Sequence, residues 1–143
     1  MFMGDFSHTI DQKGRLIIPS KFRDELGEKF VLALGLDGCV YAYPMGEWDK
    51  LEQKLRSLPL NNKNARNIVR FLVSFASTCE LDKQGRVMIP ETLRKRAGLE
   101  KEVVLAGNIG RIEIWDKAKW EESTDFSDVD SMEADLAECG IMI

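Results

Sequence analysis

The chain repeats one stretch of sequence at an offset of 71 residues. Residues 11–19 read Asp-Gln-Lys-Gly-Arg-Leu-Ile-Ile-Pro, and residues 82–90 read Asp-Lys-Gln-Gly-Arg-Val-Met-Ile-Pro. The correspondence continues, because Arg23 matches Arg94 and Gly27 matches Gly98. Self-similarity of this length and order is typical of duplicated structural units. The sequence therefore predicts a fold built from two copies of one small unit.

Turn residues separate short apolar runs within each unit. Asp11 and Gly14 are typical of a tight turn between two strands, which predicts a hairpin. Pro19 suits the first turn of a helix, and Gly27 suits the residue that ends it. The pattern predicts an α+β fold. The expected elements are strands at 6–10, 15–18, 30–34 and 39–43 with a helix at 19–26, and then strands at 79–81, 86–89, 102–106 and 111–115 with a helix at 90–97.

Two further helices are expected after the first unit. Apolar residues recur three and four positions apart in 47–58 and in 64–76, which indicates amphipathic helices separated by Pro59. Their apolar stripes should face the core or a subunit interface. Residues 123–143 show no sustained pattern, so we expect a mobile end. The predicted division is a first unit at 5–60, a connecting helix at 61–76, a second unit at 77–123 and an acidic tail at 124–143.

Charge is distributed unevenly along the chain. The net charge is −4, which is unusual for a protein that binds nucleic acid. However, residues 121–143 contain eight acidic residues and no lysine or arginine, so the rest of the chain carries a net charge of +4. A mildly basic body is compatible with a polyanionic partner. The tail either competes for the basic surface or only keeps the protein soluble.

The composition argues against several other classes of protein. No apolar run approaches the roughly 18 residues of a membrane span, and the N-terminus lacks the features of a secretory signal. We therefore expect a cytoplasmic protein without a membrane partner. Cys39, Cys79 and Cys139 are widely spaced and His8 is the only histidine, which predicts reduced thiols and no metal site. Without a phosphate-binding glycine motif or a recognisable catalytic pair, we expect no cofactor, no small-molecule substrate and no enzymatic activity.

The two repeated turns carry the side chains that best suit a function. Each turn places an arginine directly after a glycine, with a lysine and a glutamine nearby. Arginine donors match phosphate or a guanine edge, glutamine can pair with adenine, and lysine binds phosphate. A β-ribbon also fits a DNA groove. The predicted DNA-binding residues are Arg15, Arg86, Lys13, Lys83, Gln12 and Gln84, and Asp11, Gly14, Asp82 and Gly85 are expected to structure the turns.

A purely structural role would explain the same residues. In that interpretation the aspartate and the arginine of each turn form a salt bridge that holds a hairpin in place. Repetition of the turn does not separate the two interpretations, because a duplicated fold would require the turn twice in either case.

The two Asp-x-x-x-Arg turns, each followed by an apolar strand and a proline, closely resemble the MraZ family. The residues that carry the resemblance are Asp11-Gln-Lys-Gly-Arg-Leu-Ile-Ile-Pro-Ser-Lys-Phe-Arg and Asp82-Lys-Gln-Gly-Arg-Val-Met-Ile-Pro, and the resemblance covers about residues 1–123. One copy alone would indicate only the wider AbrB-like class. The resemblance implies a tandem pair of AbrB-like swapped-hairpin β-units that interlock into a pseudo-dimeric barrel with flanking helices.

The same resemblance implies a function. Members of the family are bacterial transcriptional regulators that form rings of subunits, bind repeated DNA boxes and associate with the nucleoid. We therefore expect a sequence-specific regulator of its own promoter and of the division and cell-wall gene cluster. Its partners would be double-stranded DNA and further copies of itself. The alternative is an oligomeric protein-interaction scaffold, or an antitoxin-like module, without sequence-specific DNA binding.

Overall fold

Eight short strands and six helices follow one another in the computed structural model, which describes residues 1–143. The chain is a mixed α and β protein, as the sequence pattern predicts. The elements are β1 (Asp5–Thr9), β2 (Arg15–Ile17), α1 (Ser20–Leu26), β3 (Lys29–Leu34), β4 (Val40–Pro44), α2 (Met45–Arg56), α3 (Lys63–Val73), β5 (Ser77–Glu80), β6 (Arg86–Met88), α4 (Glu91–Arg96), β7 (Glu102–Asn108), β8 (Arg111–Asp116), α5 (Lys117–Ser123) and α6 (Val129–Glu138).

Local sequence explains where these elements begin and end. Pro19 occupies the N-cap position of α1, and Gly27 follows the last residue of that helix with a φ of 81°. The turns between β1 and β2 and between β5 and β6 contain Gly14 and Gly85, whose φ angles are 82° and 75°. Residues with a Cβ rarely adopt this left-handed conformation, so glycine is needed at both turns.

Strand pairing joins the two units to each other. Six strands form one antiparallel sheet in the order β1-β7-β8-β4-β3-β5, and β2 and β6 form a separate two-stranded sheet. Only β3 with β4 and β7 with β8 pair inside one unit. The expected hairpin on either side of each turn is therefore wrong, because β1 pairs with β7 and β2 pairs with β6. Each unit is too small to bury a sufficient core alone, and the exchange gives both units a shared one.

The main hydrophobic core lies between the sheet and the elements that follow the two turns. Equivalent residues of the two units meet there, so that Leu16 and Ile18 are matched by Val87 and Ile89, all with no exposed surface. A smaller cluster around Tyr41, Tyr43 and Trp115 occupies the other face of the sheet. Trp48 of α2 and Trp120 of α5 pack against this second cluster. The central strands are consequently buried on both faces.

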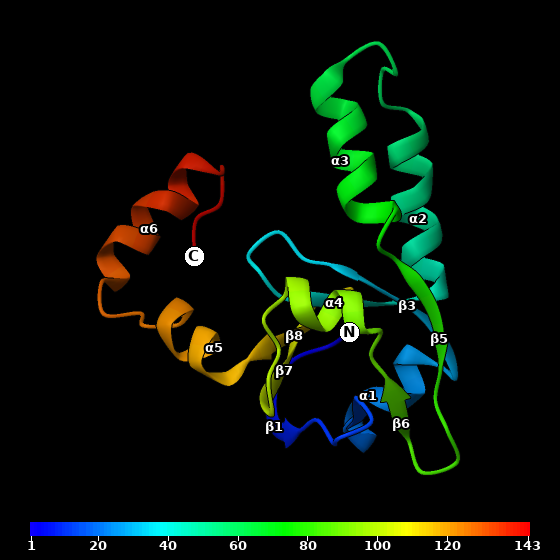
Figure 1. Cartoon of the computed structure of the whole chain (residues 1–143). Helices are drawn as coiled ribbons and strands as arrows, with labels where there is room; N and C mark the ends of the chain where they lie inside the picture. The colour runs from blue at the N-terminus through cyan, green and yellow to red at the C-terminus, as the bar shows by residue number, and fades with distance from the viewer.

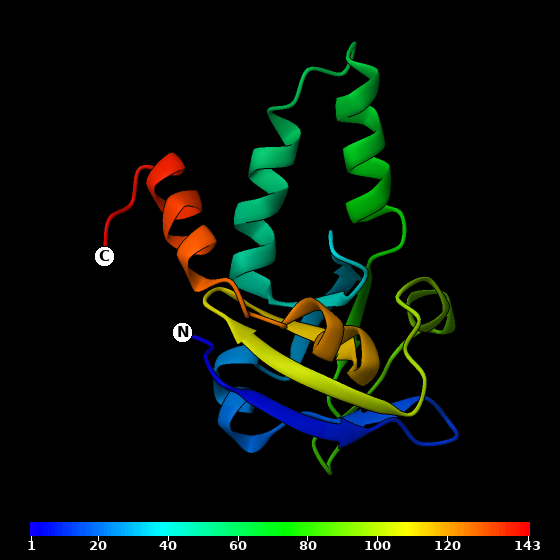
Figure 2. The same cartoon turned by 90° about the vertical axis from the view of Figure 1, so that its left-hand side faces the viewer.

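Helices α2 and α3 form a hairpin that projects from the sheet (Figures 1 and 2). The turns that contain Gly14 and Gly85 lie at the end of the molecule away from the tip of this hairpin. Helix α3 ends at Val73, three residues before the predicted end, because the amide of Ala76 bonds to the carbonyl of Val73 and β5 begins at Ser77.

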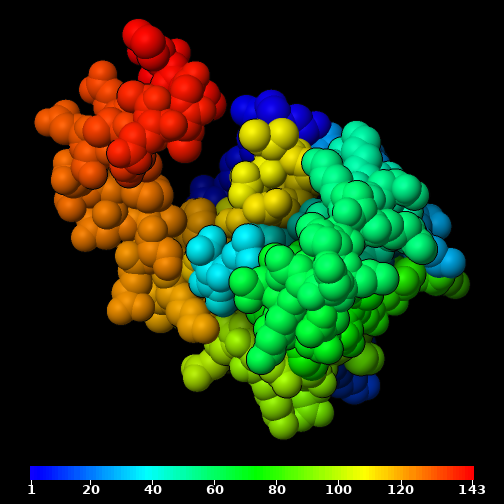
Figure 3. All heavy atoms as spheres, turned by 90° about the horizontal axis from the view of Figure 1, so that it is seen from above, coloured from blue at the N-terminus to red at the C-terminus, as the bar shows by residue number.

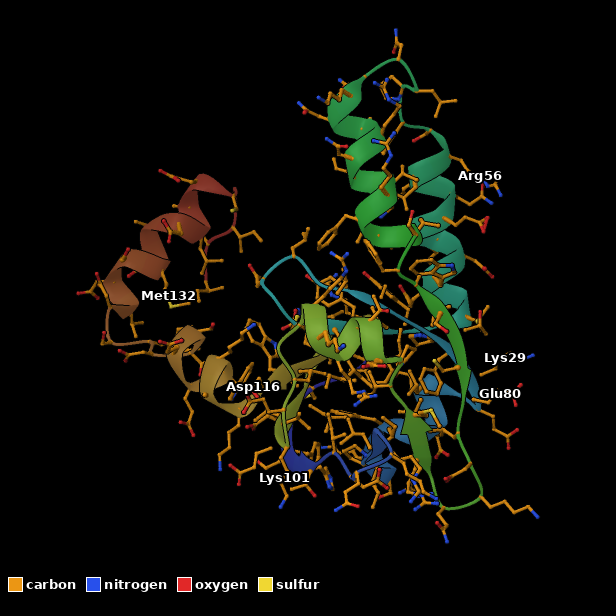
Figure 4. The ribbon with its side chains drawn as sticks, in the orientation of Figure 1. Lys29, Arg56, Glu80, Lys101, Asp116 and Met132 are labelled. Carbon is orange, nitrogen blue, oxygen red and sulfur yellow. The ribbon has the colours of Figure 1, made fainter.

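At the edge of the sheet, Lys29 of β3 and Glu80 of β5 form an ion pair of 3.5 Å between the units (Figure 4).

The acidic tail contains regular structure that the sequence pattern did not predict. Asp128 caps α6, because its side chain accepts a hydrogen bond of 3.1 Å from the amide of Ser131. Most side chains of α6 are exposed, and the helix stands apart from the α2–α3 hairpin when the molecule is viewed from above (Figure 3). None of the six helices has the length and the apolar character that would let it cross a membrane.

Candidate nucleic-acid interface

The first turn is held together by the carboxylate of Asp11. Its Oδ1 accepts hydrogen bonds of 2.9 Å from the backbone amides of Lys13 and Arg15. Its Oδ2 accepts a hydrogen bond of 2.7 Å from the Nε of Arg15, which also makes this contact a salt bridge. The salt bridge expected in the structural interpretation is therefore present, although the strands on either side of the turn do not pair with each other. The terminal amino groups of the Arg15 guanidinium donate no hydrogen bond to the protein, so they are available to a ligand.

The second turn reproduces this geometry. Oδ1 of Asp82 accepts hydrogen bonds of 2.9 Å from the amides of Gln84 and Arg86, and Oδ2 accepts one of 2.9 Å from the Nε of Arg86. The arginine side chains of the two turns are 31% and 26% exposed, which places both at the surface with a restrained orientation. Because the aspartate binds only the Nε side of each guanidinium, it aims the other side outward.

The carboxylates of Asp11 and Asp82 have lowered pKa values. The largest cause at each turn is the hydrogen bond from the backbone amide of the arginine four residues later. The side-chain hydrogen bond from the same arginine and a second backbone amide lower the pKa further, while desolvation opposes them. Both aspartates therefore remain ionised at neutral pH and keep their arginines oriented.

Acid should loosen both turns. A carboxyl group whose pKa is lowered by folding contributes stability above its ordinary pKa, 3.8 for these aspartates, and that contribution is lost as the pH falls through the lowered folded value. We expect the amide resonances of Lys13 and Gln84 to shift together with this titration, below the ordinary aspartate pKa. A nuclear magnetic resonance titration of the carboxyl carbons measures the midpoints. A midpoint at or above 3.8 for either aspartate would contradict the geometry.

The pairing of β2 with β6 brings the two arginines onto one surface. In this register Arg15 lies opposite Met88, and Ile17 lies opposite Arg86. These four residues share one face of the two-stranded sheet, since the residues between them, Leu16 and Val87, point into the core. Arg15 and Arg86 are diagonal neighbours, which places their backbones about 7–8 Å apart. Two arginines from distant parts of the chain thus form one exposed pair on a ribbon.

Two further arginines, which the sequence analysis matched to each other but did not assign to the site, complete each turn from the other unit. A Cβ on Gly14 would lie 2.9 Å from Cζ of Arg94, and a Cβ on Gly85 would overlap the guanidinium of Arg23. Arg23 donates from Nε to the carbonyl of Ile18 at 2.7 Å. Arg94 makes the equivalent bond to Ile89 at 3.0 Å. The recurrence of these arginines in the repeat is a sequence signal that could have indicated a role at the site. Their contact with the turn of the other unit, however, depends on the exchange of strands.

The remaining predicted contact residues are all at the surface. Gln12 and Lys13 are exposed in the first turn, and Lys83 and Gln84 are exposed in the second. The lysine and the glutamine stand in opposite order in the two turns, so the two ends of the ribbon present different side chains. The structure therefore brings the predicted residues to one ribbon and its two adjoining turns.

Cys39 and Cys79 are poorly suited to reactive chemistry. Burial raises the pKa of Cys39 to about 12 and also raises the pKa of Cys79. All three cysteines are free thiols, and only Cys139 is exposed. A thiol with a raised pKa is a poor nucleophile at neutral pH, because the reactive species is the thiolate.

Comparison with known proteins gives consistent matches over both units. A family model described as "MraZ protein, putative antitoxin-like" matches residues 1–71 and again residues 72–138. A relative from Clostridium beijerinckii is 51% identical over 142 residues, which covers 99% of this chain and 100% of the relative. A relative from Halothermothrix orenii is 58% identical over 120 residues, or 84% of each chain. A third, from Pediococcus pentosaceus, is 57% identical over 123 residues, or 86% of each chain.

All three relatives carry the name "Transcriptional regulator MraZ". The duplicated fold, the twin Asp-x-x-x-Arg turns and these relatives define a transcriptional regulator rather than an enzyme. The chain belongs to the MraZ family, which confirms the resemblance found in its two turns.

Proposed function

We propose that the protein regulates transcription by binding double-stranded DNA sequence-specifically through the exposed face of β2 and β6. The observation that carries the proposal is the arginine pair on that face. Arg15 and Arg86 are diagonal neighbours, each is oriented by an aspartate through Nε, and each keeps its terminal amino groups free. This arrangement suits a bidentate contact with a guanine edge or with a phosphate.

The side chains around the arginine pair have complementary roles in this proposal. Lys13 and Lys83 contact phosphates, and Gln12 and Gln84 reach base edges. The aspartates and glycines of the turns hold the ribbon in shape. The guanidinium groups of Arg23 and Arg94 add positive charge next to each turn. Local charge explains how a chain with a net charge of −4 can bind a polyanion.

The fold in this proposal is the AbrB-like swapped-hairpin barrel, with units at 5–60 and 77–123, a connecting helix at 61–76 and an acidic tail at 124–143. The outer strands of the six-stranded sheet, β1 and β5, each lead through a turn into the β2–β6 pair. That continuity supports closure of the two sheets around the shared core. Closure would also protect the sheet edges from pairing with other chains.

We further propose that the protein acts in the cytoplasm, on the nucleoid, as a ring-like homo-oligomer. Its targets would be its own promoter and the division and cell-wall gene cluster. A ring presents several copies of the arginine face to successive DNA boxes. Once one subunit has bound a box, the neighbouring subunits are held at a high effective concentration near the next boxes. The overall affinity of the assembly is therefore higher than that of any single contact.

A gel-retardation titration tests the DNA-binding proposal directly. The probes are the upstream region of the protein's own gene and an unrelated duplex of equal length, each at 50 and 200 mM salt. We expect preferential retardation of the upstream region. The affinity should also fall about tenfold or more between the two salt concentrations, because the counterions released by only two phosphate contacts are enough to produce this change. Equal retardation of both duplexes would contradict sequence specificity.

The second candidate is an interaction scaffold or an antitoxin-like module. An incompletely covered apolar surface on the α2–α3 hairpin favours it, because Leu60, Ile68 and Val73 are 81%, 47% and 43% exposed. A scaffold of this kind would retard neither duplex in the same titration. The two candidate functions are therefore separated by one experiment.

A further inference from the structure

The α2–α3 hairpin carries an apolar groove along its length. The groove has a volume of about 340 Å³, with Glu52 and Arg56 at its rim. Helix α2 has no fully buried residue, and α3 buries only Ala65 and Leu72. An apolar groove on a surface helix pair, with few residues covered by its own chain, is typical of a site where another element packs. Its apolar lining consists of Trp48, Leu55, Leu60, Val69 and Val73.

Helix α6 has an apolar face that is largely exposed. Val129 and Met132 are 65% and 43% exposed, and they lie on one side of the helix with Leu136. The ten residues of α6 span about 15 Å, close to the length of either helix of the hairpin. Helix α6 is therefore long enough to lie alongside either helix of the hairpin.

The charges of the two elements are opposite. Residues 45–73, which form the hairpin, contain six basic and three acidic residues, whereas residues 121–143 contain eight acidic residues and no basic residue. Arg66 and Arg70 of α3 hydrogen-bond only to neutral groups, the carbonyl of Leu60 and the side chain of Asn67. Their charges are therefore not neutralised within the chain. The apolar groove and its basic surroundings both match the acidic, amphipathic helix.

The geometry favours a groove on a different copy of the chain. Helix α5 is fixed to the body by the edge-to-face contact of Trp120 with Trp115 and by a hydrogen bond from Lys119 Nζ to the carbonyl of Ala97. From this anchored helix the chain continues into α6, and two views separated by 90° show α6 apart from the hairpin (Figures 1 and 3). Arg56 on α2 and Met132 on α6 accordingly lie on different sides of the molecule (Figure 4).

We propose that α6 of one copy docks into the α2–α3 groove of a second copy. The contact is heterologous, because it joins two different surfaces, and repeated copies of such a contact close into a ring when the rotation allows it. It assigns the acidic tail a role in assembly. The proposal rests only on the homo-oligomer within the proposed function, and it is independent of where DNA binds.

The experiment uses two full-length variants that damage opposite sides of the contact. One carries Met132→Glu with Leu136→Glu in α6, and the other carries Leu60→Glu with Val73→Glu in the groove. Mass photometry measures the assemblies formed by each variant alone and by an equimolar mixture. Ala134→Glu, which adds one negative charge at another exposed position of α6, is the control for added charge. Circular dichroism verifies that each variant keeps its helices.

We expect each double variant alone to lose the higher assemblies, and Ala134→Glu to keep them. In the mixture, an intact helix on one copy meets an intact groove on the other, so 1:1 dimers should form. Unchanged assemblies for the double variants, or the absence of dimers from the mixture, would overturn the proposal, and the latter result would point to docking within one chain. The double variant Arg15→Ala with Arg86→Ala keeps the helix and the groove and tests DNA binding separately by gel retardation, so failure of one proposal does not imply failure of the other.

Discussion

The double variant Arg15→Ala with Arg86→Ala should lose affinity for its DNA boxes by about a hundredfold or more. Each arginine that binds a base edge contributes about 1–3 kcal/mol, and the two side chains lie next to each other on the same face. An assembly that binds several boxes at once would multiply the loss. Gel retardation or fluorescence anisotropy on the upstream region measures it. The fold should be retained, because both guanidinium groups are at the surface.

Two further variants make this prediction specific. Arg15→Lys keeps the positive charge but removes the bidentate geometry, so we expect weaker discrimination between boxes and unrelated DNA with a smaller change in non-specific affinity. Lys54→Ala removes an exposed positive charge from α2, at the other end of the molecule from the turns, and should leave DNA binding unchanged. If the Lys54 variant weakens binding as much as the arginine variant does while mass photometry shows unchanged assemblies, the contact surface is the helical hairpin and the assignment of the ribbon is wrong.

Much of the local structure could be predicted from the sequence because it depends on residues close together in the chain. The left-handed conformations of Gly14 and Gly85 follow from a tight turn that needs glycine, and the end of α1 at Leu26 follows from Gly27. The carboxylate of Asp11 binds backbone amides only two and four residues away. Such interactions leave a signature within a few residues, which the repeat displays twice.

The exchange of strands could not be predicted from the local pattern, and only the resemblance to the MraZ family implied interlocking hairpins. A strand such as β1 has the same alternating pattern whether it pairs with β2 or with β7, so the sequence favoured the nearer partner. The contacts of Arg23 with Gly85 and of Arg94 with Gly14 depend on that exchange, and no local spacing indicates them. Helix α6 was missed for a different reason. Its short apolar face lies in a strongly acidic segment and is largely exposed.

The exchange makes a single core from two units, and that core has a measurable energetic consequence. Phe22 of α1 is 1% exposed and makes edge-to-face contacts with Phe2 and Phe6 at centroid distances of 5.6 and 5.2 Å. The same core cluster includes Leu93 of the second unit. Because neither unit has a core of its own, damage to one should destabilise the other by the same amount.

The variant Phe22→Ala should lower the free energy of unfolding by about 3–5 kcal/mol, the usual cost of the lost burial and the resulting cavity. Hydrogen exchange measured by mass spectrometry should show protection falling by about two to four orders of magnitude, about equally, in β3 of the first unit and β7 of the second. Leu36→Ala, at a residue that is 74% exposed, should change stability by less than about 0.5 kcal/mol. Protection lost only in the first unit would mean that the units fold independently. The exchanged pairing of β1 with β7 and of β3 with β5 would then contribute little to stability, although the structure places both pairs at the edges of one sheet.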